Sequence, residues 1–516
     1  MNKLRVLILK PTRYNHDREG GRGYAERFKW GLMPNSTIPF MRGLTPDVLG
    51  GWEIETFPID EHVQTDPEYL NLLNGSVPTL LALVGVQSNQ FHRALDLAAY
   101  FLSKDGQHCV IGGPHPMTCD TSMLHGMGVS FAFSEAENVW LEILRDAIDG
   151  ALKPVYGTEK RWQNKLESPI LKPPSPSDLR RYFLPLMGIY PARGCPFTCN
   201  FCSVIKIAGR QVRSQLIETT MASLRAAKEA GVGYVMFTSD NFNKYSEAKE
   251  LLDQMIEERI SLPFVVQCDT QIARQEGLVA KLAKAGCFQF YIGIESLNRR
   301  VLLNAHKTQN HPETYRTIVE LCRKYKIKSH FSNIIGFPED TEASILAGNR
   351  EIIKIGPDIT SWYILTPIPG TEQYDDFLAE GVIWEPNLDQ FDGAHPTWRH
   401  PTLSAKKLLE LMFECYRRFY SSSFIFGNVR RHGFRNRSNL LLNLYWEIAM
   451  PIFARWCAFS QVNPLSGGIG ECNLDSAWDY LDLRKKRFGY DLVPLPRSLD
   501  LSEADAALNR SVKLNF

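Results

Sequence analysis

Short, continuously apolar runs alternate with segments of helical periodicity along most of this chain. In the first third the apolar runs are residues 4–9, 79–86 and 109–111, and residues 91–104 carry apolar side chains at helical spacing. Strands that are apolar along their whole length predict a parallel sheet covered by helices on both faces. Such sheets bind ligands beyond the carboxyl ends of their strands, so we expect a site at that edge.

A second series of apolar runs predicts another α/β unit. Its strands are expected at residues 186–190, 234–238, 264–268, 288–294, 330–335 and 361–365. Helical stretches separate them, including residues 217–230, 248–259 and 312–324. Six strand-and-helix repeats predict a partial or complete α/β barrel, whose active site is built from the loops after the strands.

These signals divide the chain into four segments. We expect an α/β domain at residues 1–150, a proline-rich linker at 151–185, a barrel at 186–378 and a mainly helical region at 379–516. Helices are predicted at 404–420 and 438–458 in the last segment, which we expect to cover the barrel mouth and select substrate. Its aromatic side chains are more typical of a core than of ligand contacts: Trp384, Phe391, Tyr416, Phe419, Trp446 and Trp456.

Composition excludes several classes of protein. The 516 residues include 58 Lys and Arg against 57 Asp and Glu, so the net charge of +1 predicts no nucleic-acid partner. Eleven cysteines are too few for a disulfide scaffold, which favours a reducing, cytoplasmic compartment. The apolar stretch at 439–461 is interrupted by Glu447, Pro451 and Arg455 and is not expected to span a membrane.

Three cysteines lie close together directly after the first strand of the barrel. Cys195, Cys199 and Cys202 have C-x3-C-x2-C spacing on a loop that begins with Gly and Pro. Buried structural cysteines rarely crowd in this way, and a structural zinc site needs a fourth ligand, for which no second Cys or Cys/His pair stands nearby. Three thiolates suit a four-iron, four-sulfur (4Fe–4S) cluster with one iron left open to bind a small molecule.

This spacing, with Phe201 before the last cysteine, resembles the radical S-adenosylmethionine (radical SAM) enzymes. Segments after later strands resemble the family's S-adenosylmethionine-binding motifs in the same order, ending at PIPGT, residues 367–371. Ser239 stands where the commoner second-strand motif has an acidic residue. Taken singly, each motif would also suit a turn, a cap or a salt-bridged carboxylate. The resemblance implies that S-adenosylmethionine is bound by Phe201, Asp240, Asn241, Gln267, Asp269, Glu295, Ser296 and Gly336.

The first domain resembles the Rossmann-like cobalamin-binding domain that precedes the barrel in one branch of this family. A nucleotide site is the alternative, but neither G-x-G-x-x-G nor a P-loop occurs in this domain. The Asp-x-His-x-x-Gly loop that supplies a cobalt ligand elsewhere is absent, so His16 and His115 are expected at the surface or around the cofactor. The implied cobalamin contacts are Gln87, Ser88, Asn89, Gly112, Gly113 and Glu135.

The resemblance implies an enzyme that cleaves S-adenosylmethionine reductively and uses cobalamin to methylate an unactivated carbon in a biosynthetic pathway. An external donor such as a flavodoxin or ferredoxin would supply electrons. Oxidation, cyclisation or rearrangement without methyl transfer is an alternative outcome, and a non-catalytic iron–sulfur or zinc regulatory module is a third. The substrate stays open among tetrapyrroles, lipids and peptides.

Basic residues precede the apolar stretch at 439–461. They suit a solvated loop, or alternatively a site for an anionic substrate or a peripheral membrane contact: Arg430, Arg431, His432, Arg435 and Arg437.

Overall fold

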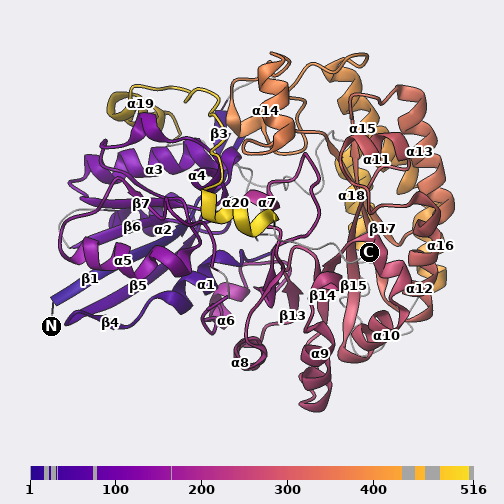
Figure 1. Ribbon diagram of the computed structural model, residues 1–516, viewed down its shortest axis with the longest axis horizontal. Helices are drawn as coiled ribbons and strands as arrows, with labels where there is room; N and C mark the ends of the chain where they lie inside the picture. Colours follow the sequence, from indigo (N-terminus) through magenta and orange to yellow (C-terminus); the bar gives the residue numbers. More distant parts are fainter. Residues whose placement is uncertain are drawn as a thin grey trace.

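The computed structural model describes residues 2–16, 22–24, 31, 33–73, 78–163, 166–432, 448–459 and 477–510. Two α/β units lie side by side in it, the first at the left of Figure 1 and the second at the right. Each is built around its own sheet. The predicted fold class is therefore confirmed.

The first sheet has seven strands. Their spatial order is β4 (Val48–Leu49), β5 (Trp52–Asp60), β1 (Asn2–Lys10), β6 (Thr79–Leu83), β7 (His108–Gly112), β8 (Ser130–Ala132) and β9 (Val155–Tyr156). All neighbours are parallel except β4 and β5. The strand order reverses between β1 and β6, and such a reversal opens a crevice for ligands at the carboxyl ends. The sheet includes β9, which lies in the range expected for the linker.

Short helices and a hairpin complete the first unit and the connection to the second. They are β2 (Tyr14–His16), β3 (Arg22–Tyr24), α1 (Thr37–Leu44), α2 (Asp66–Tyr69), α3 (Phe91–Ser103), α4 (Pro114–Thr118), α5 (Ala136–Ile148) and α6 (Pro176–Leu179). Helix α3 begins and ends within one residue of the stretch expected from its apolar spacing.

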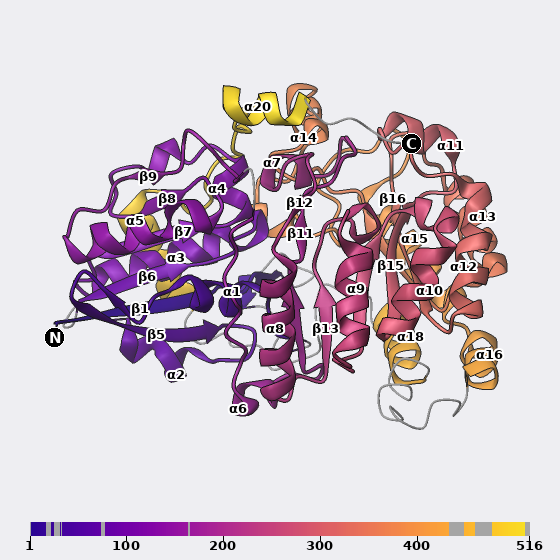
Figure 2. The ribbon, with the colours of Figure 1, turned by 60° about the horizontal axis from the view of Figure 1, so that its bottom comes forward.

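The second sheet is a six-stranded, all-parallel partial barrel. Its strands pair in chain order: β10 (Leu186–Ile189), β13 (Tyr234–Phe237), β14 (Phe264–Cys268), β15 (Cys287–Glu295), β16 (Lys328–Ile335) and β17 (Ile359–Ile364). All six strands overlap the predicted ranges. The helices between them are α8 (Ile217–Glu229), α9 (Ala248–Glu257), α10 (Glu276–Ala285), α11 (Arg299–Asn304), α12 (Tyr315–Lys324) and α13 (Glu342–Ile355). Figure 2 shows α8, α9, α10 and α12 along the outside of the barrel.

Tyrosine hydroxyls cover the open edge of the barrel at β17. Tyr420 accepts a hydrogen bond from Thr360 N at 3.0 Å and donates to Thr360 O at 2.7 Å. Tyr416 makes the same pair of bonds to Trp362, at 3.1 and 3.2 Å. Both phenols come from α15 (Ala405–Phe419) or the residue after it. They satisfy the backbone groups that an edge strand would otherwise present to another chain.

We expect Tyr420→Phe to lower the free energy of unfolding by about 1–3 kcal/mol, because it leaves the N–H and C=O of buried Thr360 without partners. Tyr325→Phe is the matched control, since its hydroxyl bond to Glu276 is exposed. Urea unfolding of the two variants measures the difference. Equal stability of both variants would show that the hydroxyl does not protect the strand edge.

The C-terminal helices contact both units. Besides α14 (Glu372–Ala379) and α15, they are α16 (Ser422–His432), α18 (Met450–Phe459), α19 (Ala477–Phe488) and α20 (Glu503–Arg510). Helix α19 packs on α3 of the first unit, and α20 lies over the junction of the two units (Figure 1). The region is helical as predicted, but it also ties the first unit to the barrel.

Several predictions fall on the C-terminal region. Phe391, Tyr416 and Phe419 are buried as expected, whereas Trp384 and Trp456 are 47% and 46% exposed, which corrects their assignment to the core. Trp446, Arg435, Arg437 and the start of the predicted 438–458 helix lie outside the described residues, as do the side chains of Arg430, Arg431 and His432. No helix among the described residues is long and apolar enough to cross a membrane.

Candidate functional site

The three cysteines lie on one loop between β11 (Ala192–Arg193) and α7 (Val204–Ile207). Gly194 opens this loop at φ +105°, and a Cβ there would lie 2.2 Å from the carbonyl oxygen of Gln211. Only glycine fits so tight a turn. Cys199 is buried and the other two cysteines are half-buried. Burial raises the pKa of Cys195 and of Cys202 to about 12, so without a metal these thiols are protonated.

Two amides donate to sulfur atoms of the loop. The Nδ2 atom of Asn241 is 3.9 Å from the Cys195 sulfur, and Nε2 of Gln309 is 3.7 Å from the Cys199 sulfur. Hydrogen bonds of this kind stabilise thiolates and tune the potential of an iron–sulfur cluster. Asn241 was predicted to contact S-adenosylmethionine, and the structure places its side-chain amide against the thiol loop.

The arrangement of the thiols bears on the kind of metal site. Among the residues that the structure describes, no three His, Cys, Asp or Glu side chains are placed to hold one metal ion. In a cubane cluster each thiolate binds a different iron, so the three sulfur atoms need not converge on one point. The donor set therefore fits a 4Fe–4S cluster better than a single zinc ion.

Predicted residues meet at the carboxyl ends of β13 and β14. Asp240 accepts a bond from Gly194 N at 2.7 Å and so holds the start of the thiol loop. Asp269 accepts from Asn241 Nδ2 at 2.8 Å and from Asn243 Nδ2 at 3.1 Å. These two carboxylates build the mouth of the barrel around the cysteines. Gln267 lies two residues earlier and is half-buried on β14.

Glu295 ends β15 in a left-handed conformation, with φ +58°. Its carboxylate pairs with Lys307 Nζ at 2.5 Å. Burial alone would lower the pKa of Lys307, but the attraction of Glu295 outweighs it and raises that pKa. The ammonium group also lies 5.7 Å from the centre of the Phe201 ring. A charged lysine thus connects Glu295 to the aromatic residue that precedes Cys202.

The last two predicted S-adenosylmethionine contacts lie farther along the barrel mouth. Ser296 follows Glu295 and accepts a hydrogen bond from Asn298 N at 3.1 Å. Gly336 follows β16 at φ +83° and donates its N–H to Asp340 at 2.9 Å. Burial raises the pKa of Asp340 to about 6, against the opposing effect of the two backbone N–H groups that it accepts from. Phe201 therefore lies on the cysteine loop, and the other seven predicted residues lie at or just after the carboxyl ends of β13, β14, β15 and β16.

The carboxyl edge of the first sheet carries the predicted cobalamin residues. Gly113, at φ +133°, packs so closely that a Cβ would lie 2.2 Å from Val86 N. Gly112, immediately before it, is the last residue of β7. Gln87 is exposed, and the Oδ1 atom of Asn89 is buried without a hydrogen-bond partner. A buried amide oxygen without a donor fits a ligand that carries amide N–H groups.

The side chains of His115 and His16 are buried rather than at the surface. His115 is buried, and its Nδ1 lies 3.0 Å from Ser88 Oγ. Burial lowers its pKa to about 3, so the ring is neutral. His16 is held by Asp389 at 3.4 Å, from the C-terminal side of the barrel. Both histidines are thus engaged by protein groups, and Ser88 bonds to protein as well.

Glu135 makes contacts that the sequence did not indicate. Its two carboxylate oxygens each accept from Arg213, at 2.8 Å, and Arg193 lies 3.2 Å away. Burial would raise the pKa of Glu135, but the two arginines lower it. Arg193 and Arg213 pair across the β11–β12 hairpin, where β12 is Arg213–Ser214. Glu135 therefore joins the first sheet to the hairpin that leads into the cysteine loop.

Other contacts show that the two carboxyl edges face each other. Thr118 of α4 bonds to the carbonyl of Pro369 at 3.5 Å, beyond the end of β17. Arg13, just after β1, pairs with Asp392 beside the same strand. The ligand edge of the first sheet thus abuts the mouth of the barrel.

Residues 189–347 match the model of the Radical SAM superfamily. The matched residues include the thiol loop and most of the parallel partial barrel, so this segment of the chain is a radical SAM domain. The family predicted from the cysteine spacing is confirmed.

Two curated relatives are bacteriochlorophyllide d methyltransferases of Chlorobaculum tepidum. The C-12(1)-methyltransferase is 29% identical over 63% of this chain and 71% of its own length. The C-8(2)-methyltransferase is 25% identical over 65% of this chain and 77% of its own length.

Among solved structures, the methyltransferase TsrM from Kitasatospora setae, with cobalamin and an iron–sulfur cluster bound, has a TM-score of 0.58 at 15% identity and covers 74% of this chain and 75% of its own. The cobalamin-dependent enzyme OxsB, with aqua-cobalamin and S-adenosylmethionine bound, has a TM-score of 0.56 at 13% identity. The match covers 95% of this chain and 79% of the OxsB chain. These likenesses show a shared fold.

Sequence reasoning missed several residues of this site. Lys307, Gln309 and Asn310 follow α11 in a loop that matches no motif, yet Asn310 fixes the end of β15 by donating to Ile294 O at 2.9 Å. Lys10 ends β1, where it donates to Gln90 Oε1 at 2.6 Å, and burial lowers its pKa to about 8. The only sequence feature that could have indicated this buried charge is the position of Lys10 directly after an apolar strand.

Proposed function

We propose that this protein is a cobalamin-dependent radical SAM methyltransferase that methylates an unactivated carbon of a biosynthetic intermediate. The observation that carries the proposal is the meeting of two ligand edges: the cysteine loop at the barrel mouth and the carboxyl edge of the first sheet, joined through Glu135. The relatives named above as methyltransferases support the reaction class. When bound, the cluster supplies the electron that cleaves S-adenosylmethionine, and cobalamin supplies the methyl group.

The residues at the barrel mouth fit a cluster and S-adenosylmethionine. Cys195, Cys199 and Cys202 would hold the cluster, with Asn241 and Gln309 donating to two of the sulfur atoms. Around them, Asp240, Glu295 and the backbone near Gly336 offer acceptors and donors suited to a zwitterionic nucleoside. These side chains would orient the ligand.

The first sheet fits cobalamin at its carboxyl edge. Gly113 lets the loop after Gly112 pack directly on the backbone of Val86, which brings the loops after β6 and β7 together, and the unpartnered Oδ1 of Asn89 would accept from an amide of the corrin rim. Because His115 is buried, bonded to Ser88 and packed with its ring 3.9 Å from that of Phe91, we infer that it does not bind cobalt. Glu135 contributes by holding the cysteine loop against this edge.

Anaerobic reconstitution with iron, sulfide and hydroxocobalamin tests whether both cofactors bind. We expect about four irons and one corrin per chain, with both chromophores in the ultraviolet–visible spectrum. Iron without corrin would remove the cobalamin part of the proposal, and corrin without iron would remove the radical part.

The cellular setting belongs to the same proposal. Because oxygen destroys exposed iron–sulfur clusters, we place the protein in a reducing cytoplasmic compartment, with a flavodoxin or ferredoxin as electron donor. The net charge of +1 supports a small-molecule substrate rather than nucleic acid.

A further inference from the structure

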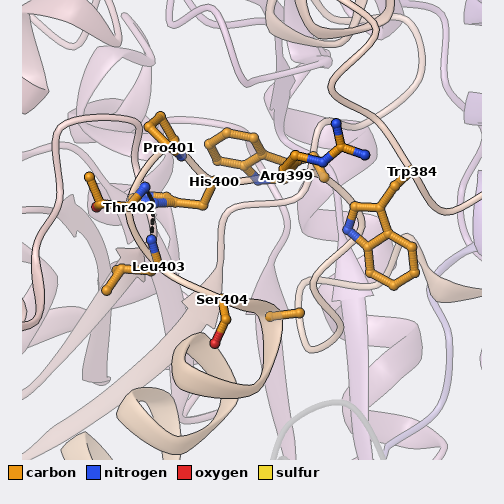
Figure 3. Close-up of a pocket in the computed structure, with 9 residues that line it drawn as sticks. Trp384, Arg399, His400, Pro401, Thr402, Leu403 and Ser404 are labelled. Carbon is orange, nitrogen blue, oxygen red and sulfur yellow. Dashed lines mark hydrogen bonds between the residues drawn. The ribbon is translucent and has the colours of Figure 1, made fainter.

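A pocket of about 370 Å³ opens beside the barrel, between the end of α14 and the start of α15 (Figure 3). One continuous segment and one preceding tryptophan line it: Trp384, Trp398, Arg399, His400, Pro401, Thr402, Leu403, Ser404 and Ala405. Its volume lies within the range of small-molecule sites.

The inner wall of this pocket is fixed by buried hydrogen bonds. The indole N–H of Trp398 donates to Leu365 O at 3.0 Å, and its ring lies 4.4 Å from that of Phe377. His400 accepts at Nδ1 from Leu403 N at 3.0 Å, so its Nε2 carries the hydrogen that it donates to Phe337 O at 2.8 Å. The wall is therefore built before any ligand arrives.

Two side chains at the pocket lack partners. Among the described residues, the guanidinium of Arg399 makes no ion pair or hydrogen bond, and the indole N–H of Trp384 has no acceptor. Both side chains are exposed, although their backbones are held: Arg399 N donates to Val382 O at 2.8 Å and Trp384 N to Thr397 O at 3.2 Å. Figure 3 shows the guanidinium and the indole on the same side of the pocket.

The wall connects this pocket to the reaction site. Phe337 and Leu365, whose carbonyls accept from the wall, follow the carboxyl ends of β16 and β17. The ring of Phe337 packs 6.1 Å from that of Phe201, beside Cys202. The inner wall of the pocket is thus joined to the cysteine loop through Phe337 and Phe201.

We propose that this pocket binds the carboxylate-bearing edge of a flat, conjugated substrate. Arg399 would pair with the carboxylate through two parallel N–H···O bonds, and the exposed face of Trp384 would stack on the ring system. The volume accommodates one edge of a macrocycle, so the remainder lies outside the pocket. This assignment rests on the proposed methyltransferase function and adds a substrate class to it.

Fluorescence titration with pyropheophorbide a and with its methyl ester tests the pocket, because the two probes differ only at the carboxylate. With the cofactor-loaded protein, we expect Arg399→Gln to weaken binding of the acid at least tenfold, and to leave the ester unchanged. Trp384→Ala should lower the affinity for both probes, whereas Trp384→Phe should retain most of the affinity.

Matched controls separate the pocket from general surface effects. Trp456 is as exposed as Trp384, and Arg316 is an exposed arginine on α12, so Trp456→Ala and Arg316→Gln should leave both probes bound as in the parent protein. Equal affinity of the parent and Arg399→Gln proteins for the acid, or no binding of either probe, would overturn the proposal. The iron and corrin content of the same samples reports separately on the proposed function, because neither residue contacts the thiol loop.

Discussion

Glu135→Gln should lower the free energy of unfolding by about 3–5 kcal/mol, because it leaves two buried arginines beside a neutral amide. Glu135 is 6% exposed and Arg213 is 3% exposed, so solvent does not compensate the lost charge. Arg193 keeps Glu137, at 3.0 Å, as its other partner, but Arg213 has no second carboxylate among the ion pairs of the described residues. Chemical denaturation measures the loss.

The same substitution should also disturb the cluster. Arg193 lies two residues before Cys195, so a change in the hairpin shifts the loop that holds the iron. In Glu135→Gln protein that still binds iron, we expect the electron paramagnetic resonance spectrum of the reduced cluster to differ from that of the parent protein. Glu135→Asp keeps the negative charge, so it should recover the parent spectrum if its shorter side chain still reaches Arg213.

The control for this pair of effects is Glu218→Gln. Glu218 pairs with Arg225 at 2.8 Å, but its side chain is 73% exposed, so its loss should cost less than about 1 kcal/mol and leave the cluster spectrum unchanged. Equal stability and identical spectra for the two variants would contradict the role given to Glu135.

Cys199→Ala should abolish cluster binding and with it all cleavage of S-adenosylmethionine. Three thiolates hold the cluster, and loss of one leaves two irons without protein ligands. Colorimetric iron determination after anaerobic reconstitution and chromatography of the nucleoside products measure both effects.

Cys415→Ala is the matched control, because Cys415 is equally buried but lies on α15, away from the loop. It should keep the iron and the cleavage activity of the parent protein. A Cys199→Ala protein that still cleaves S-adenosylmethionine would show that the three cysteines are not the cluster ligands.

The barrel was predictable because its strands are continuously apolar and their helices have clear periodicity. The cysteine loop was predictable because three metal-binding side chains lie within eight residues of sequence, directly after a glycine turn. In the first sheet, β5 was missed: WEIETFPID mixes charged and apolar residues and contains Pro58, although it pairs with β1 along its whole length. This segment forms a strand because it pairs with β1, which is distant in the sequence, and not because of its own apolar pattern.

Long-range contacts also explain what the candidate site added. Glu135 and Arg213 are 78 residues apart, and the sequence around neither residue predicts their ion pair. Gln309 reaches Cys199 from 110 residues away. Conversely, the wrong assignment of Trp384 to a core came from its residue type, because a tryptophan is buried more often than not. Only the fold shows that this side chain faces a pocket.

The most direct test of the account is the nucleoside yield of protein reconstituted anaerobically with cluster and cobalamin, then reduced in the presence of S-adenosylmethionine. The account predicts both 5′-deoxyadenosine and S-adenosylhomocysteine, with the second product absent when cobalamin is omitted. Formation of 5′-deoxyadenosine without S-adenosylhomocysteine in the cobalamin-loaded protein would contradict methyl transfer, and intact S-adenosylmethionine would contradict the radical reaction itself.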